Sequence, residues 1–361
     1  PGLQMHMRHE CDPARLEALA DAYVNDMGAA LSCALARVGD RLGLYRKLRE
    51  LGPCTSEDFA AAVGLSPRMI GEWLVNQATG GYVSYAPATR TYYLDPEQAA
   101  LLADENSRRF LMGGFQFATA LVKVEETIAQ SFAHDQGFHW GEHHPDLSIG
   151  VGRFFRPAYT NDLVTRWLAA IPEVHDRLAR GGAVADIGCG YGYSTVALAE
   201  GFPRCQVFGF DSHPPSIAHC QALAAERGLT NVEFAVANAT TFPDRRFDVV
   251  AYFNCLHDVG DPVTTLRRAH ATLRDDGLLL LSEPMAGHTV EDNFNPVGRI
   301  MSGSAVLCCV PHGIADGGHS LGTIAPDRAV ADVVHAAGFE GCARVFQTKY
   351  SRVFVARRRA S

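Results

Sequence analysis

The sequence lacks several features that would place it in other protein classes. Its 361 residues contain no run that approaches the roughly 18 apolar residues of a membrane span, so we expect no membrane-spanning helix. No repeat of 20–50 residues and no low-complexity tract is present, which argues against a solenoid or a disordered chain. The first residues lack the basic-then-apolar layout of a signal peptide, and we therefore expect a cytoplasmic protein.

An excess of positive charge is also missing. The net charge is -8, which counts against nucleic acid as the main partner because phosphate binding needs a basic face. The ten cysteines form no C-x-x-C pair and lie mostly inside apolar runs. This pattern predicts reduced, buried cysteines rather than a disulfide framework.

What is present is the composition of a globular protein, with 47% apolar and 20% charged residues. Changes in pattern along the chain divide it into three sections. We expect a winged-helix-like domain in residues 1–105, a helical section that contributes to a substrate pocket in 106–170, and an α/β domain in 171–361.

The N-terminal section has the element order of a winged helix. An amphipathic stretch over 15–51 contains Gly28, Gly39 and Gly43 as possible breaks. Helices are expected after Thr55 and after Ser66, followed by two short strands between residues 82 and 94.

DNA binding is nevertheless not the favoured role of this section. Residues 1–100 contain nine basic and twelve acidic residues, and Arg68, the only base of the second helix, is opposed by Glu72. We expect dimerisation or closure of a substrate pocket instead. The apolar face suited to a homodimer consists of Leu31, Leu35, Val38 and Leu42, although packing within one subunit is the alternative.

From Gly182 onward, strand-like and helix-like segments alternate. Repeated βαβ units predict a parallel, Rossmann-like sheet with helices on both faces, and residues 343–358 are expected to form an antiparallel strand pair. Ligands of such sheets bind at the carboxyl ends of the strands.

A glycine-rich loop follows the first of these strands, with the sequence D-I-G-C-G-Y-G from Asp186 to Gly192. Glycines let the backbone approach a ligand closely. An acid at Asp186 suits a cationic ligand better than a pyrophosphate, and Asp211 at the end of the second strand can accept hydrogen bonds from ribose hydroxyls. These features fit a ligand with an ammonium group, a carboxylate and a ribose but no phosphate.

This loop, together with Asp211, resembles that of the class I S-adenosylmethionine-dependent methyltransferases. The resemblance covers roughly residues 171–361 and implies S-adenosylmethionine as cofactor and S-adenosylhomocysteine as product. Asn238 and Ala239, where an acid is commoner in that family, would lie near the adenine. The full set of expected cofactor-binding residues is Asp186, Gly188, Gly190, Tyr191, Asp211, Ser212, Asn238, Ala239, Phe253 and Asn254.

The segment after the fourth strand, F-N-C-L-H-D-V-G-D, resembles that of winged-helix small-molecule O-methyltransferases, in which a similar run supplies a catalytic histidine. The likeness extends to a bacterial group with F-F-R-P at 154–157, L-H-D…G-D-P at 256–262 and E-D-N…N-P-V-G-R at 291–299. It implies His257 as general base, because a histidine near its ordinary pKa can remove a proton at neutral pH. Asp258 is expected to orient His257 or to cap the next helix, and Glu283 to hold His257 or a substrate donor.

Residues 284–325 are expected to form a long, irregular substrate lid, because a connection of this length is usually functional or mobile. Arg299 could pair with a substrate carboxylate or form a structural ion pair, and His312 or His319 could be an alternative base. The expected substrate-binding residues are Arg156, Tyr159, Asn293, Arg299, His312 and His319.

Two possible metal sites are not favoured by the sequence. Gly141 and Pro145 argue against a helix that would bring His139 and His143 together, and the run L-C-C-V before His312 is typical of core packing. We therefore expect no metal.

The sequence thus predicts methyl transfer to a small molecule of secondary metabolism, with oxygen as the preferred acceptor. Nitrogen, sulfur and carbon acceptors remain alternatives. So do a winged-helix regulator that senses S-adenosylmethionine and a methyltransferase fold that has lost transfer.

Overall fold

The computed structural model describes residues 11–358, which form two compact units that divide between Phe115 and Gln116. Our expectation about a signal peptide concerns the first ten residues and lies outside the described range. The three-section division of the chain remains a prediction.

The first unit begins with a long helix, α1 (Pro13–Arg41), whose start is capped by the Asp12 carboxylate accepting from the backbone N–H groups of Ala14 and Arg15. The helix continues through Gly28 and Gly39 and ends before Gly43, where φ is 70°. Only one of the three expected breaks is therefore confirmed. A Cβ at Gly39 would lie 2.5 Å from the Trp73 ring, so the glycine allows this ring to pack against α1.

The remaining elements confirm the expected order of helix, turn, helix and hairpin. Thr55 and Ser66 cap the paired helices by accepting from the N–H groups of Asp58 and Met69. The elements are α2 (Leu44–Leu51), α3 (Ser56–Val63), α4 (Pro67–Thr79), β1 (Ser84–Ala86), β2 (Thr91–Tyr93) and α5 (Pro96–Leu102). Their core is built around Tyr45, Phe59 and Trp73.

Eight irregularly joined helical segments precede the main sheet. They are α6 (Met112–Leu121), η1 (Val122–Val124), α7 (Glu125–His134), η2 (Trp140–Glu142), α8 (Asp146–Ala158), η3 (Tyr159–Trp167), η4 (Leu168–Ala170) and α9 (Pro172–Ala179). The expected helical section is interrupted within both 108–132 and 154–178. In the second, η3 is π-helical, a geometry that often marks functional sites.

The seven-stranded sheet has the order β5-β4-β3-β6-β7-β9-β8, in which β9 is antiparallel to both neighbours. The strands are β3 (Ala183–Ile187), β4 (Gln206–Asp211), β5 (Val232–Val236), β6 (Phe247–Phe253), β7 (Leu273–Pro284), β8 (Phe339–Gln347) and β9 (Ser351–Arg358). This confirms the parallel sheet and its terminal antiparallel pair. β7 begins at Leu273, directly after a helix that ends at Thr272.

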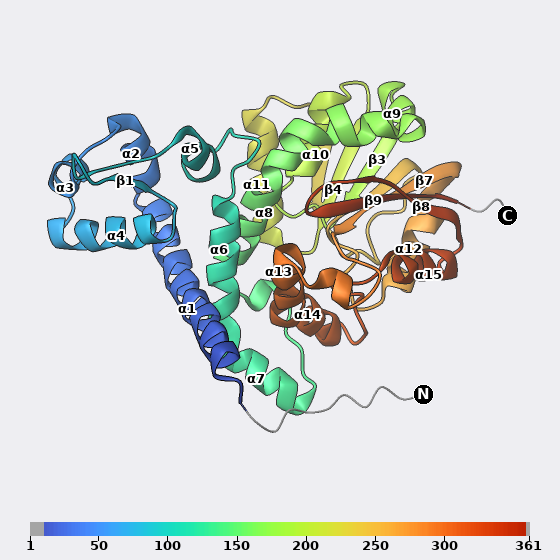
Figure 1. Cartoon of the computed structure of the whole chain (residues 1–361). Coiled ribbons are helices and arrows are strands. Elements are labelled where there is room, and N and C mark those ends of the chain that lie inside the picture. Colours follow the sequence, from blue (N-terminus) through green and yellow to red (C-terminus); the bar gives the residue numbers. More distant parts are fainter. Residues whose placement is uncertain (1–10, 359–361) are drawn as a thin grey trace. The chain divides into compact units, whose positions relative to one another are not determined.

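Alternate residues of the central strands face two separate cores, as the two-residue period of a strand requires. Val184, Val249 and Leu280 pack on the face covered by η3, α9 and α10 (Tyr193–Gly201). Ala185, Val250 and Leu279 pack on the face covered by α12 (Pro262–Thr272) and α15 (Asp327–Ala336), as Figure 1 shows. α11 (Pro214–Glu226) packs beside β4 and β5. With both faces covered, the strand ends are left for ligands.

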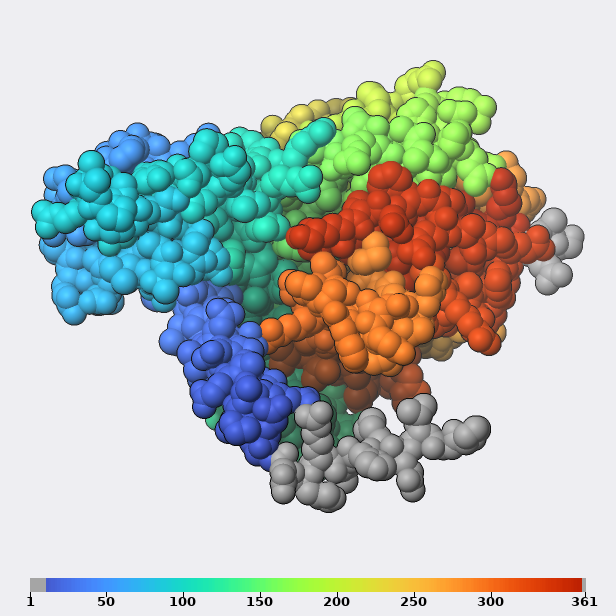
Figure 2. Space-filling model, in the orientation of Figure 1, coloured from blue at the N-terminus to red at the C-terminus, as the bar shows by residue number. Residues whose placement is uncertain are grey.

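The segment after β7 corrects our expectation of an irregular lid. It contains η5 (Glu291–Asn293), α13 (Pro296–Ser304), the π-helical η6 (Ala305–Cys309) and α14 (Val310–Ala315). The run Pro296–Ala315 has a mean hydropathy of 1.2 over its best 18-residue window. It is therefore long and apolar enough to cross a membrane, which we had not expected from the sequence. One such helix is weak evidence, because core helices pass the same test. We keep the name lid for residues 284–325, which lie beside β8 and β9 at the surface in Figure 2.

Candidate active site

The glycine loop connects the end of β3 to α10 and is held to the end of β4. The backbone N–H groups of Gly188 and Cys189 donate to the Phe210 carbonyl at 2.7 and 3.0 Å. The Gly190 N–H donates to Asp211 Oδ2 at 2.9 Å, while Asp211 Oδ1 accepts from the His213 N–H at 2.8 Å. Burial raises the pKa of the Asp211 carboxyl, and these hydrogen bonds oppose the shift.

Two glycines of this loop have different surroundings. A Cβ at Gly188 would lie 2.1 Å from Cys255 Sγ, so this position is closed by protein. A Cβ at Gly190 would meet no atom within 4 Å, although its N–H is fixed by Asp211. The space above Gly190 is therefore open, which is the arrangement needed for a ligand to approach the backbone closely.

Asp186 lies below the loop and does not face open space. Its side chain is fully buried, and Oδ2 accepts hydrogen bonds from the hydroxyls of Ser194 and Thr195 at 2.6 and 2.7 Å. Burial raises the pKa of this carboxyl to about 7, although the two hydroxyls lower it. Asp186 thus holds the first turn of α10, and its expected contact with a cationic ligand stays a proposal.

The other expected cofactor residues differ in their placement. Asn238 is exposed and its Oδ1 accepts from the backbone and side chain of Thr240, while Ala239 is half-buried and Ser212 is exposed. Tyr191 is half-buried, with its ring 4.5 Å from that of His219.

Phe253 and Asn254 end β6 and pack against the π-helical segment η3. Asn254 has a φ of 54°, and its Nδ2 donates to the Tyr159 hydroxyl at 2.8 Å. Burial raises the pKa of this hydroxyl. Tyr159 is 7% exposed and its ring lies 5.7 Å from that of Phe253, so this expected substrate residue is part of the core.

His257 follows β6 and is 5% exposed. Its Nδ1 lies 3.0 Å from Glu283 Oε2 at the end of β7, and its Nε2 lies 3.3 Å from Asp258 Oδ1. The thiol of Cys309 also interacts with the ring. The backbone carbonyl of His257 accepts from the N–H of Gly322, which joins this segment to the lid. The structure therefore brings together the three expected catalytic residues and adds Cys309.

The charge of His257 differs from what the sequence suggested. Burial lowers the pKa of the imidazole, but the carboxylates of Asp258 and Glu283 outweigh this effect and hold the pKa well above its ordinary value. The expectation of a histidine near its unperturbed pKa is therefore wrong. The two carboxylates therefore favour the protonated form of the ring.

Unpaired polar atoms gather at the carboxyl edge of the sheet. Five buried side-chain atoms among the described residues lack a hydrogen-bond partner there: Asp186 Oδ1, Asn254 Oδ1, Asp258 Oδ1, Ser282 Oγ and Glu283 Oε1. They come from the ends of β3, β6 and β7 or from the residues that follow. Because buried polar groups are nearly always paired, these atoms are candidates for contact with a polar ligand.

The expected substrate residues of the lid are mostly used for local structure. Asn293 Oδ1 accepts from the Gly287 N–H, and its Nδ2 donates to the Thr289 carbonyl, so it closes a turn. His312 Nδ1 accepts from the Trp140 N–H at 3.3 Å, while Arg299 and His319 are exposed. Arg156 on α8 lies over the Tyr193 ring at 5.8 Å.

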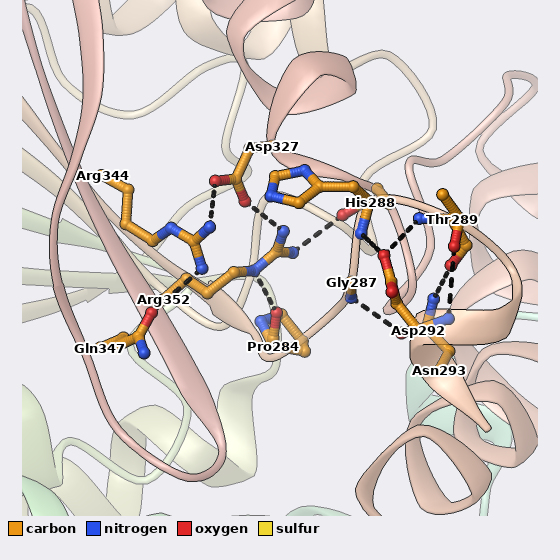
Figure 3. Close-up of polar contacts among 11 residues, drawn as sticks. Pro284, Gly287, His288, Thr289, Asp292, Asn293, Asp327, Arg344, Gln347 and Arg352 are labelled. Carbon is orange, nitrogen blue, oxygen red and sulfur yellow. Dashed lines mark hydrogen bonds and ion pairs between the residues drawn. The ribbon is translucent and has the colours of Figure 1, made fainter. Parts of the chain in front are cut away.

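One functional residue was missed at the sequence level. Arg352 on β9 is 1% exposed and pairs in register with Glu283 of β7. Its guanidinium donates to the carbonyls of Pro284 and Ala325 and to Asp327 Oδ1 at 2.7–2.9 Å, as Figure 3 shows for the labelled partners. A single buried cation thus binds the first and last residues of the lid. The signal was an arginine at the start of an otherwise apolar strand, S-R-V-F-V-A.

Comparison with known proteins agrees with this geometry. Residues 178–324 match the family described as a methyltransferase domain, and residues 29–104 match the Rv2258c-like winged HTH domain. The C-terminal unit contains a methyltransferase domain of class I fold. The matched residues include the glycine loop and the strands β3 to β7, whereas β8 and β9 follow them.

The relatives of this methyltransferase domain are distant. A trans-aconitate 2-methyltransferase of Methylobacterium radiotolerans is 32% identical over 136 residues, which are 37% of this chain and 46% of that protein. The chain spans about half the length of the curated relatives it matches.

Two solved structures are similar over nearly the whole chain. Human N-acetylserotonin methyltransferase in complex with SAM has a TM-score of 0.67 at 16% identity, with 98% and 99% of the two chains covered. Mitomycin 7-O-methyltransferase MmcR has a TM-score of 0.63 at 21% identity, with 95% and 99% covered. At these identities the similarity establishes the fold.

Proposed function

We propose that the protein transfers a methyl group from S-adenosylmethionine to a hydroxyl of a small molecule, with His257 as the general base. The observation that carries the proposal is the buried His257–Glu283 pair, which lies at the same edge of the sheet as the glycine loop and Asp211. This edge therefore combines a place for a nucleoside with an acid–base group.

The residues present fit the cofactor. The open side of Gly190 accommodates a close approach to the backbone, and Asp211 has acceptor capacity left for ribose hydroxyls after binding two N–H groups. When bound, the cofactor supplies an electrophilic methyl group. The chain must then orient the acceptor oxygen toward that group and remove one proton.

Glu283 determines how His257 performs this step. It accepts a hydrogen bond from Nδ1–H, which leaves Nε2 as the atom that takes the proton from the acceptor hydroxyl. Because the two neighbouring carboxylates raise the pKa of His257, the ring must first lose its Nε2 proton. We therefore expect the rate to rise with pH through the raised pKa of the imidazole.

We also propose the methyl acceptor, the oligomeric state and the cellular location. Arg156 and Arg299 are candidates for binding an anionic acceptor, and oxygen is preferred over nitrogen, sulfur or carbon because His257 resembles the base of O-methyltransferases. All ten cysteines are free, which suits the reducing cytoplasm. We place the reaction in secondary metabolism there.

A homodimer is proposed from the exposed apolar side chains of α1. Leu31, Val38 and Leu42 are 66%, 43% and 54% exposed, whereas Leu35 packs toward the core of its own unit. This face continues toward the start of the helix through Leu16, Leu19, Tyr23, Val24 and Met27. Contiguous exposed apolar surface of this kind marks an interface.

DNA binding is not favoured, because Arg68, the only cation of α4, pairs with Glu72 at 2.6 Å.

The cofactor assignment is tested by calorimetric titration with S-adenosylhomocysteine. We expect binding in the wild type and a loss of at least about tenfold in affinity for Asp211→Ala, whose carboxylate faces the loop. Asp244→Ala, which removes an exposed acid, is the matched control and should bind normally. Absence of binding to wild-type protein freed of ligand would contradict the proposed function.

A further inference from the structure

We propose that His257, Asp258 and Cys309 form a binding site for a soft divalent cation of the Zn²⁺ class, and that occupation of this site reversibly switches off the general base. Cation binding stands on the geometry alone, whereas the inhibition rests on the proposed function.

The first step is the placement of three ligand atoms. A ring nitrogen of His257, an oxygen of Asp258 and Cys309 Sγ all lie within 4.8 Å of one another. Asp258 and His257 are neighbours after β6, whereas Cys309 comes from η6, 51 residues further along the chain than Asp258. The fold therefore brings a nitrogen, an oxygen and a sulfur ligand to one place, which the spacing in the sequence does not show.

The second step is the orientation of the histidine. Glu283 Oε2 lies 3.0 Å from Nδ1 and Asp258 Oδ1 lies 3.3 Å from Nε2, so Nε2 is the nitrogen left for a cation. Histidines that bind metals usually donate their other ring N–H to a carboxylate, which fixes the tautomer and makes the ligating nitrogen more basic. Glu283 is 1% exposed and is already in this supporting position.

The third step is the chemistry of the ligand set. Imidazole and thiolate ligands favour Zn²⁺ or Co²⁺ over Mg²⁺ or Ca²⁺. Three protein ligands leave one position of a tetrahedral ion for water. The charges also balance, because a carboxylate and a thiolate neutralise a divalent ion. Binding releases one proton from Nε2 and one from Sγ, so each ligand gains the lone pair that it donates to the ion.

The consequence for catalysis follows from the same nitrogen. A cation on Nε2 occupies the lone pair that would accept the proton of the acceptor hydroxyl. With Nδ1–H bound to Glu283, the ring has no other acceptor. The loaded protein can still bind the cofactor at the glycine loop but has no general base.

Co²⁺ titration of chelator-treated protein tests the site through the absorption band that a sulfur–cobalt bond produces. We expect one equivalent to produce this band and Cys309→Ser to abolish it. Cys308→Ser is the matched control, because Cys308 is the adjacent buried cysteine and is not in the cluster; this variant should keep the band. Glu283→Gln should weaken Co²⁺ binding by about 10- to 100-fold.

A second cluster among the described residues, His139, His312 and Asp316, contains no sulfur. His139→Ala should therefore leave the band unchanged. No band in the wild type, a band that persists in Cys309→Ser, or equal loss in Cys308→Ser would overturn the site. Binding of S-adenosylhomocysteine by each variant confirms that it is folded. Methyl transfer that continues with Zn²⁺ bound at the site would overturn the inhibition.

Discussion

The two halves of the sheet's carboxyl edge are built in different ways. At β3 and β4 the site consists mainly of backbone, with the Gly190 N–H fixed by Asp211 and open space above it. At β6 and β7 it consists of buried charged side chains, with His257 between Asp258 and Glu283. The first half offers mainly backbone groups, which suit a ligand that is the same in every reaction. The second half offers side chains, which single substitutions can alter. Cofactor binding and proton removal should therefore be separable by mutation.

The largest expected effect separates the two halves directly. His257→Ala should lower kcat for methyl transfer by about 10²- to 10⁴-fold, because it removes the general base. The affinity for S-adenosylhomocysteine should stay within about twofold, since the glycine loop is untouched. Transfer of radiolabelled methyl to a panel of hydroxylated aromatic compounds measures the first quantity and calorimetry the second. His335→Ala, on the exposed side of α15, is the control. Equal loss of cofactor affinity would show that the halves are not separable.

The second-largest effect is expected on stability, at Arg352, which supports the half of the edge formed by β6 and β7. Arg352→Met should lower the free energy of unfolding by about 3 kcal/mol, because it leaves Asp327 and two carbonyls without their buried partner. Arg344 binds the same Asp327 but is 28% exposed and does not reach the lid ends. Arg344→Met should therefore cost less than about 1 kcal/mol. Urea unfolding compares the two variants, and similar losses would show that the lid contacts of Arg352 contribute little.

The backbone half can be tested at its two glycines. Gly190→Ala should lower the affinity for S-adenosylhomocysteine about tenfold, because the new methyl group enters the open space above the loop. Its cost in stability should be about 1 kcal/mol, for a φ of 52°. Gly188→Ala should cost more stability, since its Cβ would clash with Cys255. Thermal unfolding with and without ligand distinguishes the two, and an unchanged affinity for Gly190→Ala would place the ligand elsewhere.

The smallest effect is a change in pH dependence. Glu283→Gln should move the acidic limb of the kcat profile to lower pH, because one of the carboxylates that raise the pKa of His257 is lost. At the optimum pH we expect kcat to fall about tenfold, since the amide orients the ring less well. A profile from pH 5 to 10 for both proteins measures this. A limb that stays in place would mean that His257 is not the titrating base.

These two halves also differed in how far the sequence predicted them. The glycine loop and Asp211 were recognised because each directly follows a strand, and the winged-helix order was recognised from caps at Thr55 and Ser66. The resemblance identified His257, but the pKa shift depends on where Glu283 and Asp258 lie in space. Cys309 was interpreted as core packing and Arg352 was missed, because their partners are 52 and 68 residues away. No pattern of neighbouring residues in the sequence indicates such long-range contacts.

The helical content of the lid was missed for a related reason. Seven glycines in residues 284–325 suggested irregular chain. Several of these glycines instead allow close packing: Gly318 would place a Cβ 2.0 Å from the Gly260 carbonyl, and Gly298 2.0 Å from that of Asn293. Gly298 lies inside α13, whereas Gly318 follows α14, so the number of glycines did not distinguish helix from irregular chain.

The attachment of the lid has a consequence for the engineering of this fold. Both ends of the lid, Pro284 and Ala325, are bound by Arg352 from the neighbouring strand. The segment between them can therefore differ in length and sequence while its anchor points stay fixed to the sheet. Exchange of residues 286–323 for the corresponding segment of another methyltransferase should retain the glycine loop and its ligand. Such chimeras provide a route to new acceptors in which only one stretch of the gene needs to be varied.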